Sequence, residues 1–318
     1  MTAQPTAAPR PDTGPGDGPR TPVSARKNRV RRLSGGDLVV VTLMTVIPTL
    51  FVLVLVWFPA IASVLLSFTN WNGIGSLSRI QGVGFANYVN VATNYPPFWP
   101  ALRHNLTFLA VLFLVATPIG VFLAVLLDKE MRFSRFYQTA IYLPVVLSLA
   151  LVGFIWQLIY SRDQGLINQV TGSTIDWYGD PQYNLWAALV ASSWRHVGYV
   201  MLLYLAGLKG VDPSLREAAK VDGADERTTF FKVVFPVMAP INIIVVVVTV
   251  IESLRAFDLV WVINKGRNGL ELISTLVTQN IIGEASRIGF GSAMATMMLL
   301  ISSVFVAFYV RIVMREER

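Results

Sequence analysis

Three ionisable side chains lie inside one strongly apolar stretch of the sequence. Glu252, Arg255 and Asp258 recur every three residues in the run 236–263. In a helix this spacing keeps them in one sector, because each step of three residues falls only about 60° short of a full turn. Ionisable groups are costly inside a membrane, so they mark candidate positions on a solute pathway. They could hold hydroxyl groups through charged hydrogen bonds, or they could pair with one another as a polar ladder between helices.

A second group, Trp194, Arg195 and His196, lies near the middle of the apolar run 184–208. An aromatic ring beside hydrogen-bonding groups is typical of a carbohydrate pocket. Trp194 could stack on a sugar ring while Arg195 and His196 form hydrogen bonds to it. Alternatively, Arg195 could pair with Glu252 or with a group on another subunit. Three weaker candidates are more typical of hydrogen bonds between helices: Asn105, Gln279 and Asn280.

No motif of a self-sufficient enzyme occurs in the sequence. It contains no GxxxxGK[ST] phosphate-binding loop, no HExxH and no GxSxG. With no cysteine and only two histidines, it lacks the ligands of a thiolate or histidine-rich metal centre. We therefore expect no catalytic residue, metal site or cofactor in this chain. Uphill transport would need an ion gradient or an ATP-hydrolysing partner.

Six long apolar runs must position these side chains. The chain has 318 residues, of which 54% are hydrophobic and 14% charged. At 1.5 Å per residue each run is long enough to cross a hydrocarbon core of roughly 30 Å. The pattern predicts an all-α, polytopic membrane protein in contact with lipid, with a transmembrane domain at 36–318. The six predicted transmembrane helices lie at about 38–68, 104–127, 137–160, 184–208, 236–263 and 288–313.

The positive charges predict the orientation of these helices. Eighteen of the 26 Lys and Arg residues fall on the side that holds both termini, which is therefore the cytoplasmic side. The net charge of +7 reflects this asymmetry and does not indicate a nucleic-acid partner. Residues 1–35 are rich in Pro and Gly and end in "RKNRVRR" (26–32), which predicts a disordered basic tail in the cytoplasm.

A charged segment at 213–235 separates the fourth and fifth runs. Asp212 and Pro213 are typical of a helix start, because the carboxylate can cap free N–H groups and proline fits the first turn. Gly223 can end this helix in the left-handed conformation, and Asp225 can open a second one. The segment therefore predicts a two-helix elbow on the cytoplasmic face, joined to the fifth run.

The stretch "EAAKVDGADERTTFFKVVFPVMAP" (217–240) resembles the EAA loop of bacterial ABC importer permeases. Three further stretches resemble the carbohydrate permeases of the maltose and glycerol-phosphate importer group: "PAIASVLLSFTNW" (59–71), "FDLVWVI" (257–263) and "STLVTQNI" (274–281). The outer segment "NKGRNGLE" (264–271) departs from the T-x-G-G-P-like turn common in that group. The positions that fill the EAA pattern are Glu217, Ala218, Ala219, Asp222, Gly223, Ala224, Phe231 and Pro236.

The resemblance implies a permease subunit of an ATP-driven, binding-protein-dependent sugar importer in the bacterial inner membrane. It implies four kinds of partner: a second homologous permease, two ATP-binding subunits that carry ATP and Mg²⁺, an extracytoplasmic sugar-binding protein and the carbohydrate itself. The elbow residues Glu217, Ala218, Ala219, Asp222 and Gly223 would contact the ATP-binding subunit. Without a partner the elbow would be a capped surface helix. An ion-coupled secondary transporter, or an ABC permease for a non-sugar solute, is the alternative; no inverted repeat supports the former.

Overall fold

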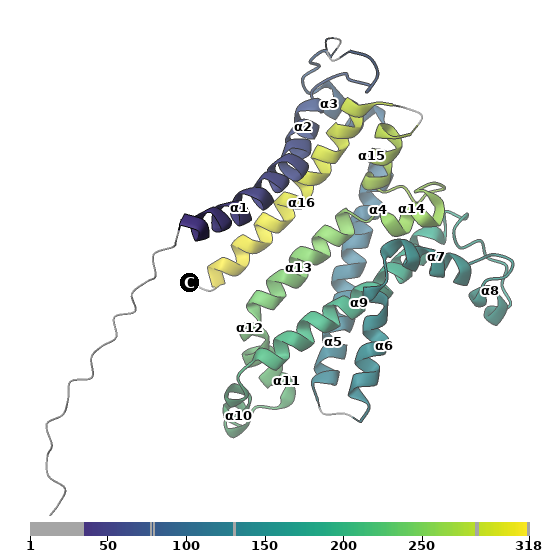
Figure 1. The fold of residues 1–318 in the computed structure, drawn as a ribbon. Coiled ribbons are helices and arrows are strands. Elements are labelled where there is room, and N and C mark those ends of the chain that lie inside the picture. The colour runs from purple at the N-terminus through teal and green to yellow at the C-terminus, as the bar shows by residue number, and fades with distance from the viewer. Residues whose placement is uncertain (1–34, 77, 79, 130–131, 284–285, 317–318) are drawn as a thin grey trace, which may run out of the picture. The chain divides into compact units, whose positions relative to one another are not determined.

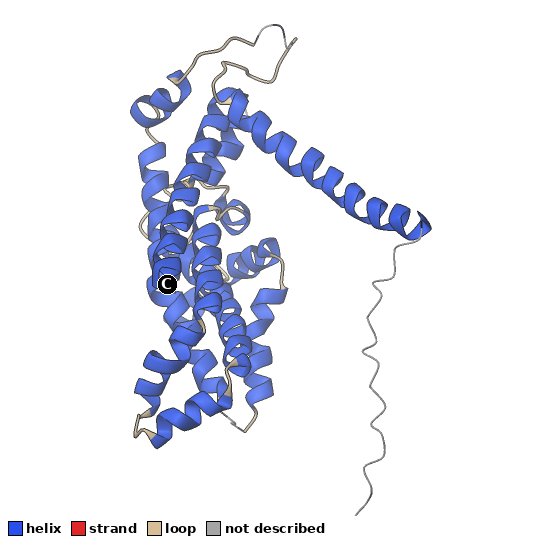
Figure 2. Ribbon diagram, turned by 90° about the vertical axis from the view of Figure 1, so that its left-hand side faces the viewer, coloured by secondary structure: helices blue, strands red, loops and turns tan. Residues whose placement is uncertain are grey.

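The computed structural model describes residues 35–316, except 77, 79, 130–131 and 284–285. Throughout the described residues the regular structure is helical (Figure 2), with one isolated antiparallel bridge between Thr69 and Gly82. The chain divides into two units, Met1–Val54 and Leu55–Arg318, and each is described by itself. Residues 1–34 of the predicted disordered tail lie outside the described residues. The all-α fold class is confirmed.

The first unit contributes α1 (Gly35–Val52), an apolar helix with Pro48 inside it. The π-helical turn η1 (Leu53–Trp57) follows and leads into α2 (Phe58–Leu66), so that one continuous helical stretch covers Gly35–Leu66. This matches the predicted run 38–68.

The second unit contains the remaining helices, which Figure 1 traces along the chain. In order they are α3 (Ala86–Asn94), α4 (Phe98–Val111), η3 (Leu112–Ala116), α5 (Thr117–Asp128), α6 (Ser134–Val146), α7 (Leu149–Ile159), α8 (Leu166–Thr171), α9 (Asn184–Gly210), α10 (Pro213–Val221), α11 (Glu226–Thr229), η4 (Phe230–Val234), α12 (Phe235–Val237), α13 (Ala239–Leu254), α14 (Asp258–Asn264), α15 (Ile273–Ile281) and α16 (Ile288–Glu316).

Each of the three π-helical turns ends two residues before a proline: Pro59, Pro118 and Pro236. A proline in a helix has no N–H to donate, and its ring clashes with the carbonyl four residues earlier. That carbonyl lies inside the π turn in all three cases. The wider turn accommodates the proline and lets the helix continue, which explains how α4, η3 and α5 form one stretch over Phe98–Asp128.

The prediction of one unbroken helix per apolar run is wrong for two runs. Helices α6 and α7, in the run 137–160, meet at 103°. Leu147 is extended there, and the Ser148 hydroxyl caps α7 by accepting a hydrogen bond from the Leu151 N–H at 3.2 Å. The run 236–263 bends by 78° between Val237 and Ala239. Pro240 favours this break, since proline fits the first turn of a new helix.

Fewer helices than six are individually long and apolar enough to cross a membrane. The described residues contain three such helices, Gly35–Leu66, Phe98–Asp128 and Ile288–Arg311, or up to five if each bent pair forms one span. Helix α9 is 27 residues long, but Arg195 and His196 lower its hydropathy. The helix boundaries of the predicted first, fourth and sixth runs agree with the structure within three residues, whereas the second begins six residues earlier than predicted, at Phe98.

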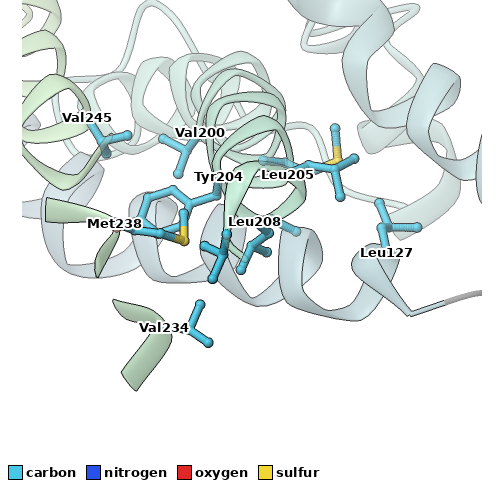
Figure 3. Close-up of a cluster of buried hydrophobic side chains, with 11 residues drawn as sticks. Leu127, Val200, Tyr204, Leu205, Leu208, Val234, Met238 and Val245 are labelled. Carbon is cyan, nitrogen blue, oxygen red and sulfur yellow. The ribbon is translucent and has the colours of Figure 1, made fainter. Parts of the chain in front are cut away.

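Helix α9 packs closely against α5 and α6. Gly120 of α5 lets α5 and α9 approach each other closely, because a Cβ there would lie 2.7 Å from Val200 Cβ. Toward the α10 end of this contact, a buried apolar cluster joins α5, α9, η4 and α13 (Figure 3); it includes Tyr204, Val234 and Met238. Movement of the segment that carries Val234 is therefore transmitted to α5 and α9, because densely packed side chains resist compression.

Candidate functional site

The elbow predicted at 213–235 is formed by α10 and α11, and both helices begin on a capping carboxylate. Asp212 Oδ1 accepts a hydrogen bond from the Ser214 N–H at 2.9 Å, and Asp225 Oδ1 accepts one from the Thr228 N–H at 2.9 Å. These hydrogen bonds hold the pKa of Asp212 and of Asp225 below the ordinary value of 3.8, because they favour the ionised form. A lowered pKa stabilises the fold above the ordinary pKa, and this contribution is lost as the pH falls through the folded-state pKa.

Gly223 makes the turn between the two elbow helices. Its φ is +81°, in the left-handed region that favours glycine. The chain then folds back, and the Ala224 N–H donates to the Ala219 carbonyl at 2.9 Å. The turn therefore closes in the manner expected for a glycine after a helix end.

An ionic hub fixes the elbow to the helices behind it. Asp128, at the end of α5, accepts hydrogen bonds from Arg216 of α10 at 2.7 Å and from Lys209 of α9 at 3.1 Å. The same Arg216 guanidinium donates to the Leu208 carbonyl at 3.1 Å. Sequence reasoning missed this hub. In the sequence, Asp128 is a charged residue at the end of an apolar run. Nothing in its spacing indicates a pairing with Arg216, which lies 88 positions later.

The elbow presents one face outward and buries the opposite one. Ala219 is buried, whereas Glu217, Ala218 and Val221 are exposed; the Val221 side chain is 87% exposed. Glu217 has no hydrogen-bond or ion-pair partner among the described residues. The remaining predicted contact residues are also exposed: Asp222, Gly223, Phe231 and Pro236. The geometry leaves a surface with apolar, acidic and basic side chains open to another molecule, the basic ones being Lys220, Arg227 and Lys232.

A cavity of about 280 Å³ gathers four of the six predicted pathway residues. Arg195 of α9, Glu252 of α13, Arg255 and Asp258 line it, together with apolar side chains such as Phe108 and Leu112. Arg195 donates to Glu252 Oε1 at 2.9 Å. The alternative that Arg195 pairs with Glu252 is therefore confirmed. This pair still lines the cavity, where its remaining polar atoms could meet a solute.

The alternative that Glu252, Arg255 and Asp258 pair with one another as a polar ladder is wrong. Helix α13 ends at Leu254, and α14 begins only at Asp258. The described residues show no ion pair from Arg255 to Glu252 or to Asp258. The helix ends here because Asn105 binds its last carbonyls: its Nδ2 donates to Ser253 O at 3.0 Å and to Leu254 O at 3.1 Å.

The other two predicted pathway residues do not line this cavity. Trp194 packs edge-on against Trp156 at 5.8 Å between ring centroids and lines a different, apolar hollow. His196 is only 1% exposed; its Nε2 is 3.1 Å from Thr117 Oγ1 and 3.2 Å from Thr249 Oγ1, and its Nδ1 is 3.5 Å from Glu252 Oε2. Consecutive helical residues point about 100° apart, so Trp194 faces another hollow, while His196 lies buried behind the Glu252 carboxylate that Arg195 also contacts.

The expected hydrogen bonds between helices are confirmed for Asn105, whereas Gln279 and Asn280 bind residues just beyond the ends of α14 and α3. Asn105 of α4 also accepts from the Ile273 N–H at 3.0 Å, so it joins α13 and α15. The Gln279 amide donates to Lys265 O at 3.0 Å, and the Asn280 amide donates to the Tyr95 hydroxyl at 3.0 Å. Within the described residues, no group of three or more His, Asp or Glu could hold a metal ion.

A family model described as "Binding-protein-dependent transport system inner membrane component" matches residues 116–318, which is more than half of the chain. The chain belongs to this family. It is therefore a permease component of a binding-protein-dependent importer and a membrane protein. The matched residues include the whole elbow and every side chain of the cavity except Phe108 and Leu112.

Two relatives and one solved structure are similar to this chain over most of its length. A probable starch degradation products transport system permease, AmyD of Thermoanaerobacterium thermosulfurigenes, is 29% identical over 85% of this chain and 92% of its own length. The arabinooligosaccharides transport system permease AraP of Halalkalibacterium halodurans is 30% identical over 78% of this chain and 79% of its own. A bacterial ABC transporter that imports alginate has the same fold, with a TM-score of 0.75 and 19% identity over 88% of this permease and 96% of its own chain.

Proposed function

We propose that this permease forms the translocation pathway of an ATP-driven sugar importer and receives its driving movement through the elbow. The observation that carries the proposal is the elbow itself. It is capped at both helices, fixed to α5 and α9 through Asp128, and exposed at Glu217, Ala218 and Val221. A rigid, attached and otherwise unpartnered surface of this kind suits a subunit that pushes on it.

The proposed partners follow from what this chain lacks. It has no phosphate-binding loop, so ATP and Mg²⁺ belong to two ATP-binding subunits. The elbow side is then cytoplasmic, in agreement with the positive charges of 209–235, and both termini lie on that side. A second homologous permease completes the pathway, and an extracytoplasmic binding protein delivers the solute in the bacterial inner membrane.

Sugar is the solute class that the cavity and the relatives favour together. The names of AmyD and AraP give starch degradation products and arabinooligosaccharides as their solutes. In this chain, Arg255 and Asp258 line the cavity without an ion-pair partner among the described residues. A cation and a carboxylate can donate to and accept from sugar hydroxyls, and the apolar wall around them suits the C–H faces of a ring.

Co-purification tests the coupling role. The wild-type permease is expected to retain an ATP-binding subunit from its native host, and Glu217→Lys is expected to release it, because the reversed charge would repel a basic groove. Asp163→Lys, in an exposed loop outside the elbow, is the matched control and should retain the subunit. Equal retention by Glu217→Lys and Asp163→Lys would contradict the assignment, provided that all variants reach the membrane in equal amounts.

A further inference from the structure

A second polar pocket is lined in part by residues of α3. Helix α3 lies at the end of the Leu55–Arg318 unit opposite α10 (Figure 1). The pocket encloses about 370 Å³ and shares no lining residue with the cavity around Arg195 and Glu252. Five of its ten lining residues are asparagines, and one, Arg287, is charged. We name it the asparagine pocket; its asparagines are Asn70, Asn72, Asn87, Asn90 and Asn94.

Three of these asparagines line one face of α3. Asn87, Asn90 and Asn94 follow the spacing i, i+3, i+7, which places side chains on the same side of a helix. The Asn87 Nδ2 donates to Ser67 O and to Thr69 O, each at 2.8 Å, and so holds the end of α2 against α3. The pocket wall is therefore fixed by hydrogen bonds that cross between two segments.

The other two α3 asparagines retain unused hydrogen-bonding capacity. The Asn94 Nδ2 donates to Asn90 Oδ1 at 2.9 Å. This contact leaves the Asn90 N–H groups and the Asn94 oxygen without a partner among the described residues. One edge of the pair can thus donate and the other can accept, as adjacent hydroxyls of a sugar require.

Aromatic side chains and a single cation complete the pocket. Tyr95 and Phe290 meet edge to face at 5.3 Å, and the Arg287 guanidinium lies 5.2 Å from the centre of the Phe290 ring. Trp71 is held in place because its carbonyl accepts from the Gly289 N–H at 2.9 Å. The pocket therefore combines amides with rigid aromatic edges.

The Trp71 indole carries an unsatisfied donor. Its Nε1 is buried and has no hydrogen-bond partner, although the residue lines a polar pocket. A buried N–H without an acceptor is costly, so native proteins rarely leave one unpaired. This N–H has almost no accessible surface, so Trp71 contributes its apolar ring to the pocket wall and not its donor.

We infer that the asparagine pocket is a second carbohydrate-binding site, specific for neutral, polyhydroxylated solutes. Amide groups both donate and accept, the aromatic edges contact apolar ring faces, and the volume falls within the range of small-molecule sites. One cation among ten lining residues gives little reason for an anionic ligand. The inference rests on the proposed function: if the elbow is cytoplasmic, this pocket faces the side from which sugar arrives.

Saturation-transfer NMR on the full chain in lipid nanodiscs, without ATP-binding subunits or binding protein, tests this site. The probes are maltotriose and arabinotriose, and galacturonate serves as an acidic comparison. We expect a neutral-sugar signal that Asn90→Leu/Asn94→Leu weakens to an apparent Kd about tenfold higher, as the loss of about two hydrogen bonds predicts. Trp71→Ala removes an aromatic wall of the pocket and should also weaken binding.

Two control variants separate this site from the rest of the chain. Thr93→Ala changes α3 outside the pocket and should leave the signal unchanged. Arg255→Gln alters the cavity around Arg195 and Glu252. It should not change the part of the sugar signal that is lost in Asn90→Leu/Asn94→Leu. Thermal unfolding of each variant shows whether a lost signal reflects lost folding.

Several results would overturn the inference. One is the absence of a neutral-sugar signal from wild-type chain. Another is equal binding by the wild type and by both pocket variants, and a third is binding that requires the galacturonate carboxylate. If the pocket variants bind sugar normally but lose association with the binding protein, the pocket is a protein-docking surface instead. Absence of ATP-driven sugar uptake by the whole transporter would contradict the proposed function, whereas uptake without sugar bound at this pocket would contradict the inference alone.

Discussion

At the scale of single residues, the ionic hub on Asp128 has the most direct consequence. The Asp128 side chain is 11% exposed and accepts from two cations on different helices. Asp128→Asn removes the charge that both cations require. Hydrogen bonds to charged groups contribute about 1.5–3 kcal/mol each, so the attachment of α10 to α5 should weaken by at least about tenfold in its equilibrium.

We expect Asp128→Asn to lower transport while the permease stays folded in the membrane. Uptake in vesicles measures the first effect, and protease accessibility of the elbow measures its looser attachment. Asp163→Asn, an exposed carboxylate outside the elbow, is the matched control. Unchanged uptake and unchanged protease accessibility in Asp128→Asn would mean that the hub does not hold the elbow.

The cavity gives a second prediction at this scale. Arg255→Gln removes an unpaired cation that could donate to sugar hydroxyls, so the apparent KM for uptake should rise by about tenfold or more. Trp194→Ala should have a smaller effect, because Trp194 lines another hollow. Both variants should keep the ATP-binding subunit. A larger effect of Trp194→Ala than of Arg255→Gln on KM would contradict this placement of the pathway.

The sequence correctly predicted some of the side chains that line the cavity, but it was partly wrong about the direction in which neighbouring side chains point. The alternative that Arg195 pairs with Glu252 is confirmed, because the two side chains form an ion pair. The sequence grouped Trp194 and His196 with Arg195, but Trp194 faces another hollow, and His196 is buried beside Glu252 without lining the cavity. The Asp128 hub depends on tertiary contact between distant residues, which spacing alone cannot reveal.

At the scale of elements, the elbow depends on the turn at Gly223. Its φ of +81° is costly for a residue with a Cβ, by about 1–2 kcal/mol, and more for a β-branched one. Gly223→Val should therefore tilt α10 relative to α11 and abolish coupling. ATP-driven uptake should fall by about tenfold or more, while binding of solute to the permease remains.

Gly210→Ala is the matched control for this turn. Gly210 lies in helical conformation at the end of α9, and a Cβ there would meet no atom within 4 Å. It should transport normally. Normal coupling in Gly223→Val would show that the turn geometry is not needed, whereas a defect in Gly210→Ala would point to general sensitivity of this segment.

Helix positions were largely predictable from the sequence, and helix breaks were not. Apolar runs and capping residues predicted the extents of α9, α10 and α16 closely. The break after Leu254 depends on Asn105, which binds the carbonyls of a helix nearly 150 positions away. Helix α15 was missed for a related reason: it lies in a predicted outer loop and is buried by contacts with α4 and α16.

At the scale of the whole molecule, the apolar cluster and the hub connect the elbow to the helices that line the cavity. Val234 and Met238 pack with α5 and α9, and α9 carries Arg195 into the cavity. A push on the elbow would therefore move the Arg195–Glu252 pair, which joins α9 to α13. The proposed energy source and the proposed pathway are linked by continuous packing within one unit of the chain.

The most direct test is sugar uptake by the assembled transporter in proteoliposomes, with the ATP supply and the proton gradient controlled separately. The account predicts uptake that requires ATP inside the cytoplasmic compartment, persists after a protonophore collapses the gradient, and is lost in Glu217→Lys. Uptake that continues without ATP and stops when the proton gradient collapses would contradict it and would establish an ion-coupled transporter.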